Sequence, residues 1–423
     1  MATRKDQRRA LLGVNLGGVL EFYDWLAYLF LVPFFGSQFF PSSDKTAVLL
    51  SSFAVFAVGS LARPIGAIVL GRVGDRVGRR PALLASMGLM ALSSTLMAIL
   101  PTYAVVGIMA PVLLVCVRIL QGFALGPDGG ASVTLLAEAA PPKRRGLFTS
   151  TLQIGVSVGA LLVTAEISLL QAFLTAEQMS SFGWRLVFGM GAVLALTTLF
   201  IRRRLPETDT ADPATRRARR PIQEIWQHHR IAFLRIVLVG GSGMGLFYGY
   251  TALLPSIGPT YTSISAGMAA HANTIATFCM LALVPVGGLL SDRIGRVWTL
   301  RLFFILCLLV FPAMWALNGT FTPQLIAAIL ASVLTVIWTG GANALYPELL
   351  PPRARAFGVA AGFGIGVAIF GGFAPMVSSS IVGAFGLVGV AWFVLAMGAL
   401  SAIATIKLKE TAHAPLLTDA DSP

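Results

Sequence analysis

The segment GRVGDRVGRR, residues 71–80, decides the fold of this chain. It places five charged side chains between two apolar runs, each long enough to cross a lipid bilayer. A thinner copy, GLLSDRIGR, returns at residues 288–296 in the second half of the chain. This repetition indicates that the chain consists of two related halves.

The composition indicates a membrane protein. Of the 423 residues, 56% are hydrophobic and 12% are charged, whereas soluble domains carry roughly 25% charged residues. Residues 81–117 contain no charged side chain, and a run of that length requires two crossings of about 20 residues each. The expected class is an all-α membrane protein. The three cysteines, Cys116, Cys279 and Cys307, lie far apart in apolar segments, so we expect neither a disulfide framework nor a metal site.

The apolar segments divide the chain into twelve expected membrane-spanning helices. They cover residues 10–35, 47–70, 81–101, 107–139, 146–170, 184–201, 231–255, 267–290, 297–317, 323–347, 356–383 and 386–407. The N-terminal basic run followed by the first of them is too long for a secretory signal, and it carries two acidic residues. We therefore expect it to remain in the protein as the first helix.

The basic residues fix an expected orientation. With the N-terminus in the cytoplasm, all but four of the 31 Lys and Arg lie on the cytoplasmic side. Lys45 and Arg185 lie outside, and Arg63 and Arg118 lie within helices. The positive-inside rule predicts this asymmetry and places both termini in the cytoplasm, with the protein in the plasma (inner) membrane. The net charge of +13 is then a topological signal, and we expect no nucleic-acid partner.

Two acidic residues lie near the middle of the first expected helix. Glu21 and Asp24 are three residues apart and share one helix face. A carboxylate at that depth costs about 2.5 to 3.5 kcal/mol on insertion scales, so both must face the interior of the bundle. A carboxyl group removed from water binds a proton more readily, which favours a role in proton transport. The alternative is a structural pair held by a buried arginine or by the backbone.

Charged residues also occur inside the second and fourth expected helices. Arg63 can be the counter-ion of a protein carboxylate or of a substrate carboxylate, and both alternatives remain open. The fourth helix contains Arg118 and Asp128, with Gly126 and Pro127 next to the acid. A loosened helix that carries an intramembrane charge is typical of a transport site. A permanent salt bridge between Arg118 and an acid is the alternative.

The fifth helix adds Gln153, a close-packing face at Gly155 and Gly159, and Glu166 near the outer end, where we expect it to be accessible to solvent. At mid-membrane depth the second half has only uncharged polar groups, among them Tyr248 and Asn343.

A second repeat joins the helix-end loops. Glu138 precedes Arg145 at the same spacing at which Glu348 precedes Arg355. Parallel six-helix halves predict a central site between them and alternating access by rocking. The expected boundaries are residues 1–201 for the first bundle, 202–230 for a cytoplasmic linker, 231–408 for the second bundle and 409–423 for a cytoplasmic tail.

Several motifs resemble one transporter family. The segment 71–80 and the run RILQG at 118–122 resemble signatures of the major facilitator superfamily. The runs EFYDW at 21–25, RPIG at 63–66, GWR at 183–185 and IFGG at 369–372 are similar to its metabolite:proton symporters. These import citrate, other di- and tricarboxylates, 2-oxoglutarate, shikimate, or proline and betaine. The resemblance extends over about residues 8–408 and implies a proton-coupled importer.

The resemblance also implies a cytoplasmic latch formed by the charged loops. Its expected gating residues are Asp75, Arg76, Arg79, Glu138, Arg145, Asp292, Arg293, Arg296, Glu348 and Arg355. The chain departs from the family pattern where Gly126-Pro127-Asp128 replaces Gly-Gly-Glu, and where Val297 replaces a basic residue. The fifth helix lacks the Gly-Pro run of drug exporters, which favours import.

The sequence thus predicts a symporter for a small organic anion such as citrate, working as a monomer in the lipid bilayer, with the proton as coupling ion and no cofactor. The expected proton-coupling residues are Glu21, Asp24, Asp128 and Arg118. The expected substrate-binding residues are Arg63, Arg118, Tyr23, Gln153, Tyr248 and Asn343. If a substrate carboxylate takes an arginine from an internal acid, that acid becomes free to bind a proton.

Three other functions fit the sequence less well. An importer of a zwitterion such as betaine or proline would use an aromatic cage, for which Tyr23, Tyr248 and Trp338 are candidates. A non-transporting membrane sensor would carry a sizeable soluble domain, and residues 202–230 are too few for one. A membrane enzyme is disfavoured because the sequence contains four histidines and no catalytic cluster at either face.

Overall fold

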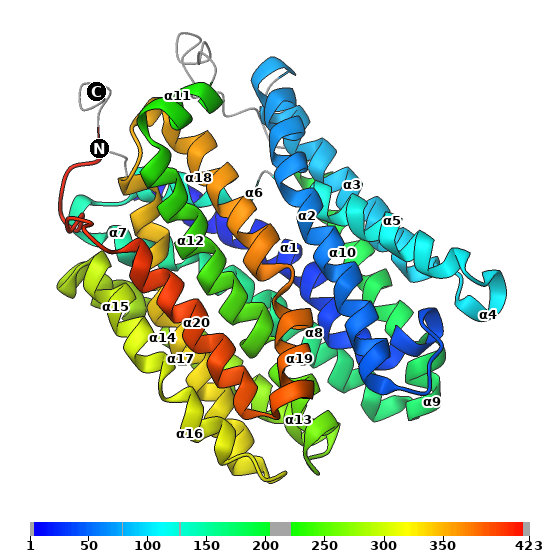
Figure 1. Ribbon diagram of the computed structural model, residues 1–423. Coiled ribbons are helices and arrows are strands. Elements are labelled where there is room, and N and C mark those ends of the chain that lie inside the picture. Colours follow the sequence, from blue (N-terminus) through cyan, green and yellow to red (C-terminus); the bar gives the residue numbers. More distant parts are fainter. Residues whose placement is uncertain (1–3, 78, 127, 204–220, 418–423) are drawn as a thin grey trace.

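The computed structural model describes residues 4–77, 79–126, 128–203 and 221–417, and every regular element in these ranges is a helix (Figure 1). The first half consists of α1 (Arg4–Phe39), α2 (Lys45–Val77), α3 (Arg79–Ile99), α4 (Tyr103–Val106), α5 (Met109–Ala124), α6 (Asp128–Ala139), η1 (Pro142–Arg144), α7 (Arg145–Ser150), α8 (Leu152–Phe173), α9 (Ala176–Gln178), η2 (Met179–Gly183) and α10 (Trp184–Arg203).

The second half follows with α11 (Pro221–His228), α12 (Arg230–Leu246), η3 (Phe247–Thr251), α13 (Leu254–Tyr261), α14 (Ala266–Ile294), α15 (Arg296–Cys307), α16 (Val310–Trp315), α17 (Phe321–Glu348), α18 (Pro352–Gly366), η4 (Val367–Gly371), α19 (Ala374–Phe385) and α20 (Val388–Ala404). Figure 1 shows the two halves side by side, with the chain ends and α11 at one end of the molecule. We call this end the terminal face. The far end, which carries α9, α13 and α16, is the opposite face.

The expected membrane-spanning architecture is confirmed. The described residues contain ten helices long and apolar enough to span a membrane, and two shorter apolar helices, Met109–Ala124 and Val388–Ala404. The basic segment at 71–80 differs from the expected loop, because α2 remains helical to Val77 and α3 begins at Arg79.

Several crossings are interrupted. The fourth expected helix breaks between Ala124 and Asp128, as the glycine and proline there predicted. The seventh and eleventh crossings contain the π-helical segments Phe247–Thr251 and Val367–Gly371, which the hydropathy pattern did not indicate. Such segments are frequent at functional sites, and the first of them carries Tyr248.

Within the first bundle, helices pack backbone against backbone at glycines. A Cβ atom on Gly122 of α5 would lie 1.8 Å from the Gly59 carbonyl oxygen of α2, so only glycine fits there. The expected close-packing face at Gly155 and Gly159 is confirmed, because added Cβ atoms would lie 2.8 Å and 2.6 Å from carbonyl oxygens of α1. This contact holds α1 firmly against α8.

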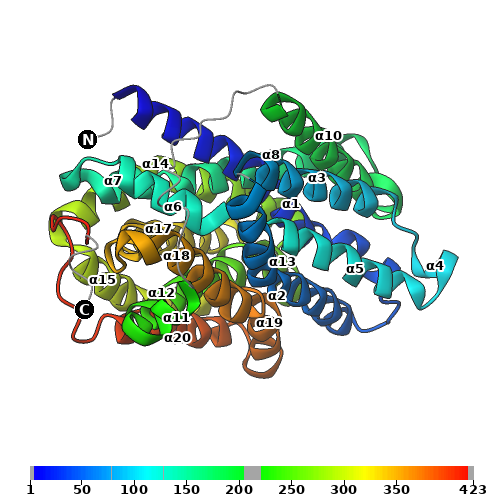
Figure 2. The same ribbon diagram turned by 90° about the horizontal axis from the view of Figure 1, so that it is seen from above.

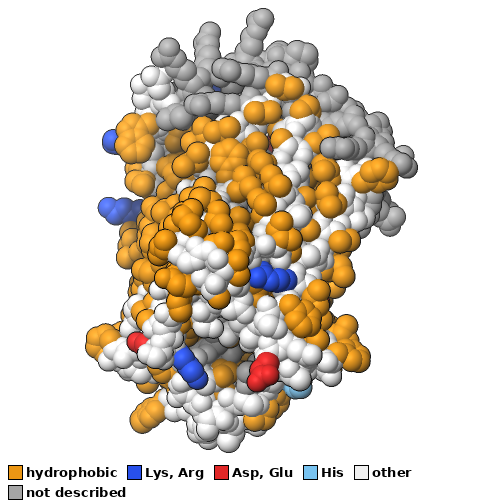
Figure 3. All heavy atoms as spheres, turned by 90° about the vertical axis from the view of Figure 1, so that its right-hand side faces the viewer, with side chains coloured by type: hydrophobic (Ala, Val, Ile, Leu, Met, Phe, Trp, Pro, Cys, Tyr) orange, Lys and Arg blue, Asp and Glu red, His pale blue; other side chains and the backbone are white. Residues whose placement is uncertain are grey.

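The outer surface is apolar. On α10 the exposed side chains Met190, Val193, Leu196 and Phe200 recur at helical spacing. Figure 3 shows one face of the molecule on which apolar side chains gather over the middle and upper part, with few charged side chains among them. An apolar surface of this extent is suited to lipid.

The two bundles meet along a central interface. The views in Figures 1 and 2 place α14, α17 and α18 of the second bundle next to α6, α7 and α8 of the first. Further along the interface, α2 contacts α18, η4 and α19. The interface runs from the charged helix ends at the terminal face to the centre of the molecule.

Candidate functional site

Four charged side chains lie buried at the centre of the molecule. Glu21 and Asp24 come from α1, Arg63 from α2 and Arg118 from α5, and their exposed fractions are 8%, 2%, 5% and 0%. A nitrogen of Arg63, Nη2, lies 3.0 Å from Glu21 Oε1. The spacing of three on α1 turns both acids inward, as the sequence predicted.

Asp24 is held by uncharged donors. The hydroxyl of Ser94 donates a hydrogen bond of 2.6 Å to Asp24 Oδ1. The side-chain amide of Gln121 donates from Nε2 to Asp24 Oδ2, and its Oε1 accepts a hydrogen bond from Arg118 Nη1. Gln121 therefore stands between the acid and the arginine.

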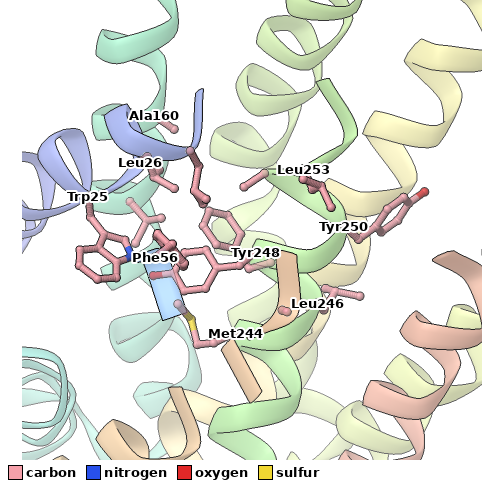
Figure 4. Packing of buried hydrophobic residues seen from close by; sticks show 14 of the residues in the cluster. Trp25, Leu26, Phe56, Ala160, Met244, Leu246, Tyr248, Tyr250 and Leu253 are labelled. Carbon is pink, nitrogen blue, oxygen red and sulfur yellow. The ribbon is translucent and has the colours of Figure 1, made fainter. Parts of the chain in front are cut away.

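Aromatic rings enclose the Arg118 guanidinium. Its central carbon lies 4.2 Å from the ring centres of Trp25 and Tyr28, and 5.3 Å from that of Phe56. The central guanidinium carbon of Arg63 lies 5.2 Å from the centre of the same Trp25 ring. Cation–π contacts of this kind stabilise a desolvated cation. The second bundle closes the cluster with Tyr248, whose ring lies 5.3 Å from that of Phe56 (Figure 4).

Five buried polar atoms of this cluster have no hydrogen-bond partner of good geometry within the described part of the chain, although the Tyr248 hydroxyl lies close enough to Arg63 and Trp25 to interact with both. They are Trp25 Nε1, Arg63 Nη1, Arg118 Nε, Arg118 Nη2 and the Tyr248 hydroxyl oxygen. Buried donors are normally satisfied, so a group of unused ones marks a place for an acceptor. The two acids and two arginines sum to zero charge. We call these ten side chains the central cluster: Glu21, Asp24, Trp25, Tyr28, Phe56, Arg63, Ser94, Arg118, Gln121 and Tyr248.

Other residues expected to bind substrate lie elsewhere. The Tyr23 hydroxyl donates to Glu166 and to the Val187 carbonyl oxygen, at 3.0 Å for the latter, and so turns away from the cluster. Gln153 contacts the sulfur of Met280 at 3.8 Å. Asn343 donates to the Thr149 carbonyl oxygen at 3.3 Å, across the bundle interface.

Two further expectations concern acids of the first bundle. Glu166, expected to be accessible to solvent, is half-buried and holds Tyr23. The Asp128 side chain and all of Pro127 lie outside the described residues.

Sequence reasoning missed half of the central cluster as site residues. Trp25 lies one helical turn after Glu21, and Gln121 lies one helical turn after Arg118. Those positions were signals, because residues one turn apart on a helix share a face. Tyr28, Phe56 and Ser94 carried no signal, since aromatic and serine residues are ordinary in apolar helices.

A second charged group lies between the two bundles at the terminal face. Asp292 on α14 accepts hydrogen bonds from the backbone N–H groups of Gly146 and Leu147 on α7, at 2.8 Å and 2.9 Å. Arg296 lies 2.9 Å from the same carboxylate and 3.2 Å from Glu348. The two hydrogen bonds from Gly146 and Leu147 to Asp292 join the two bundles.

Two ion pairs also cross the interface here. Arg145 of the first bundle lies 3.6 Å from Glu348 of the second, and Arg355 of the second lies 3.0 Å from Glu138 of the first. Of the other residues expected in this latch, Arg293 is exposed. The side chains of Asp75, Arg76 and Arg79 lie outside the described part of the structure.

The C-terminal segment 410–417, which we call the strap, lies over this charged group. Glu410 accepts hydrogen bonds from the backbone N–H groups of Arg296 at 2.7 Å and Val297 at 3.1 Å. The carbonyl oxygens of Ala414 and Leu417 accept from Arg145 and Arg355, at 2.7 Å and 2.9 Å. The strap therefore contacts both bundles.

Comparison with known proteins identifies the family. Residues 14–262, more than half of the chain, match the family model described as Major Facilitator Superfamily. The chain belongs to the major facilitator superfamily. It is 31% identical over 412 residues to the alpha-ketoglutarate permease of Escherichia coli (strain K12), which covers 96% of this chain and 95% of the relative. It is 32% identical to the citrate-proton symporter of Klebsiella pneumoniae, over 90% of this chain and 87% of the relative.

Solved structures agree with the fold of this superfamily member. A structure of the proton:xylose symporter XylE superposes with a TM-score of 0.74 at 20% identity, covering 97% of this chain and 98% of the other. The chain is therefore a multi-pass membrane transporter of the major facilitator superfamily. The resemblance seen in its motifs is confirmed.

Proposed function

We propose that this chain is a proton-coupled symporter that imports a small organic anion, a di- or tricarboxylate such as citrate or 2-oxoglutarate, by alternating access. Two of its relatives are named for alpha-ketoglutarate and citrate, and others are named for shikimate and for proline and betaine. The observation that carries the proposal is the central cluster, where buried N–H and O–H groups lack acceptors next to two arginines. A carboxylate supplies acceptors of the right charge and geometry for such donors.

Charge balance supports the coupling to protons. The cluster is neutral with both acids ionised, so an added carboxylate leaves an uncompensated negative charge in a low-dielectric site. A proton on Asp24 removes that charge. Asp24 is the better proton acceptor of the two acids, because Ser94 and Gln121, which donate hydrogen bonds to it, are neutral, whereas Glu21 pairs with Arg63 at 3.0 Å. Glu21 and Arg118 complete the coupling group, and Arg63, Arg118 and Tyr248 receive the substrate.

The geometry disfavours a zwitterion importer with the expected aromatic cage. Of its three candidates, Tyr23 turns toward Glu166, and Trp338 donates to the Val239 carbonyl oxygen at 2.9 Å. Tyr248 alone lies in the central cluster. The rings that do form a cage there already enclose Arg118, so a quaternary ammonium would have to displace it.

We further propose that the terminal face is cytoplasmic and that its ion pairs form the cytoplasmic gate. The basic helix ends lie at this face, as the positive-inside rule requires of the cytoplasmic side. Opening this gate has to break the contacts of Asp292, Glu348 and Arg355 with the first bundle. The transporter works as a monomer in the inner membrane without a cofactor, and the bundles extend over residues 1–201 and 231–408 with a cytoplasmic linker between them.

Uptake by purified protein in proteoliposomes tests the proposal. Labelled citrate, 2-oxoglutarate and betaine are offered under an imposed inward proton gradient. We expect accumulation of a carboxylate and not of betaine. Asp24→Asn should retain exchange of labelled for unlabelled carboxylate but lose accumulation, because the amide carries no proton through the cycle. Glu177→Gln, at an exposed acid on α9, is the matched control and should behave as wild type. Accumulation by Asp24→Asn at the wild-type level would contradict the role of Asp24.

A further inference from the structure

The side chain of Gln121 separates the proton site from the anion site. It is fully buried on α5, with an exposed fraction of 0%. Its two polar atoms have different partners: Nε2 donates to Asp24 Oδ2, and Oε1 accepts from Arg118 Nη1. Among the described side chains no ion pair joins Asp24 directly to Arg118, so the shortest connection between them runs through this amide.

We propose that Gln121 is the positioning residue that couples proton binding to anion binding, by turning its side-chain amide over when Asp24 is protonated. The inference rests on the proposed function and adds a moving part to it. With Asp24 ionised, the amide donates to the acid and accepts from the arginine, and both partners are satisfied. Arg118 is then held by the protein with one of its N–H groups.

Protonation of Asp24 changes the donors and acceptors. A proton on Oδ2, the carboxyl oxygen that faces Gln121, needs an acceptor, whereas the Gln121 NH2 group there is a donor. Turning the amide over presents Oε1 to the O–H group, and it brings the NH2 group toward Arg118. Two donors then face each other, so Arg118 Nη1 loses its acceptor. Together with the unused Nε and Nη2, this N–H group turns to a substrate carboxylate.

The reverse order gives the same coupling. A carboxylate that binds Arg118 withdraws Nη1 from Gln121 Oε1, and the released amide oxygen can accept from a protonated Asp24. Each ligand therefore favours binding of the other, as linkage requires. No bond other than hydrogen bonds and the O–H bond of Asp24 is made or broken. Ser94 holds Asp24 Oδ1 at 2.6 Å, so the acid stays in place while the amide turns.

Several charged groups surround this switch. Arg118 lies on the same helix as Gln121, and Glu21 and Arg63 come from α1 and α2. Tyr23, next to Asp24 in the chain, reaches Glu166 on α8. Gln121 is uncharged, so its exchange for another uncharged residue leaves the charge of this group unchanged. A change in coupling then reports the amide and not a change in net charge.

The test compares three variants in proteoliposomes with labelled citrate and 2-oxoglutarate. Gln121→Met keeps the length of the side chain and removes both polar atoms. We expect accumulation near unity at a measurable rate of exchange. The wild type should reach about tenfold accumulation per proton carried under a gradient of one pH unit. Gln324→Met is the matched control. Gln324 is also buried, on α17, and its side-chain amide donates to the Leu254 carbonyl oxygen and not to a charged group. It should accumulate substrate as wild type does.

Gln121→His keeps the inference testable if the Met variant folds poorly. Neutral imidazole offers one donor and one acceptor and can exchange them by changing tautomer. We expect it to recover at least a third of the wild-type accumulation. Accumulation by Gln121→Met equal to wild type, or equal loss in the Met and His variants, would overturn the inference while leaving the symport intact. Failure of the wild type to accumulate any carboxylate would overturn the proposed function, and the inference with it.

Discussion

Replacing Asp292 by asparagine should open the gate at the terminal face. The carboxylate accepts two backbone hydrogen bonds from the first bundle, at 2.8 Å from Gly146 and 2.9 Å from Leu147. Both have to break when the bundles separate, whereas the contact with Arg296 lies within the second bundle and persists. Asparagine keeps one acceptor oxygen and turns an NH2 group toward the other N–H donor.

The magnitude follows from these two bonds. A hydrogen bond to a charged group contributes about 1.5 to 3 kcal/mol. Loss of one such bond and weakening of the other removes about 2 to 4 kcal/mol from the closed state alone. The ratio of open to closed molecules should therefore rise about 30- to 1,000-fold.

Alkylation of a buried cysteine measures this ratio. Ser150 lies at the end of α7 with 1% of its surface exposed, and a Cβ atom on Gly288 would lie 2.5 Å from its hydroxyl. Ser150→Cys is introduced after replacement of Cys116, Cys279 and Cys307, and a maleimide is added from the terminal side. We expect Asp292→Asn to raise the alkylation rate at least tenfold, and Glu177→Gln at the opposite face to leave it unchanged. A rate within twofold of the parent, in protein with a normal elution profile, would refute the gate reasoning.

Two further outcomes follow from the packing and the strap. Gly122→Ala should lower the melting temperature of detergent-purified protein by several degrees, because the new methyl group would lie 1.8 Å from a backbone oxygen. Gly88→Ala is the control and should leave the melting temperature unchanged, because its new methyl group would have no heavy atom within 4 Å. Equal melting temperatures for the two variants would contradict the backbone packing of α2 on α5. Truncation after Thr411 removes the carbonyl contacts of the strap to Arg145 and Arg355, and it should raise the alkylation rate of Ser150→Cys several-fold. Truncation after Leu417 keeps both contacts and is the control. Identical alkylation rates for the two truncations would contradict a role of the strap in closing the gate.

Sequence reasoning reached the fold because lipid leaves so few alternatives. Long apolar runs in a bilayer have to be helices, and the duplicated charged segments gave the relation between the halves. The same reasoning found the four buried charges, since a charge such as Arg118 in an apolar helix stands out. It also predicted the break near Pro127, because glycine and proline weaken a helix in a recognisable way.

The partners of those charges could not be predicted from one sequence. Which side chain meets Asp24 depends on how α1, α3 and α5 rotate about their axes, and hydropathy is nearly the same for several rotations. The hydrogen bonds that Ser94 and Gln121 donate to Asp24 could therefore not be predicted from the sequence. Tyr23 shows the opposite error, since its place beside Asp24 suggested the substrate site while its hydroxyl turns toward Glu166.

The contributions of the two bundles to the central cluster are unequal. All four charged side chains come from the first bundle, and the second supplies the ring of Tyr248. On the proposed function, proton coupling and recognition of the substrate's charge then belong to the first bundle, and the second bundle contributes shape through the ring of Tyr248. A chimera that pairs this first bundle with the second bundle of a relative should keep both its energy coupling and its preference for an anion. Changes in the second bundle can then alter the size and shape of the accepted anion while the charged machinery stays constant.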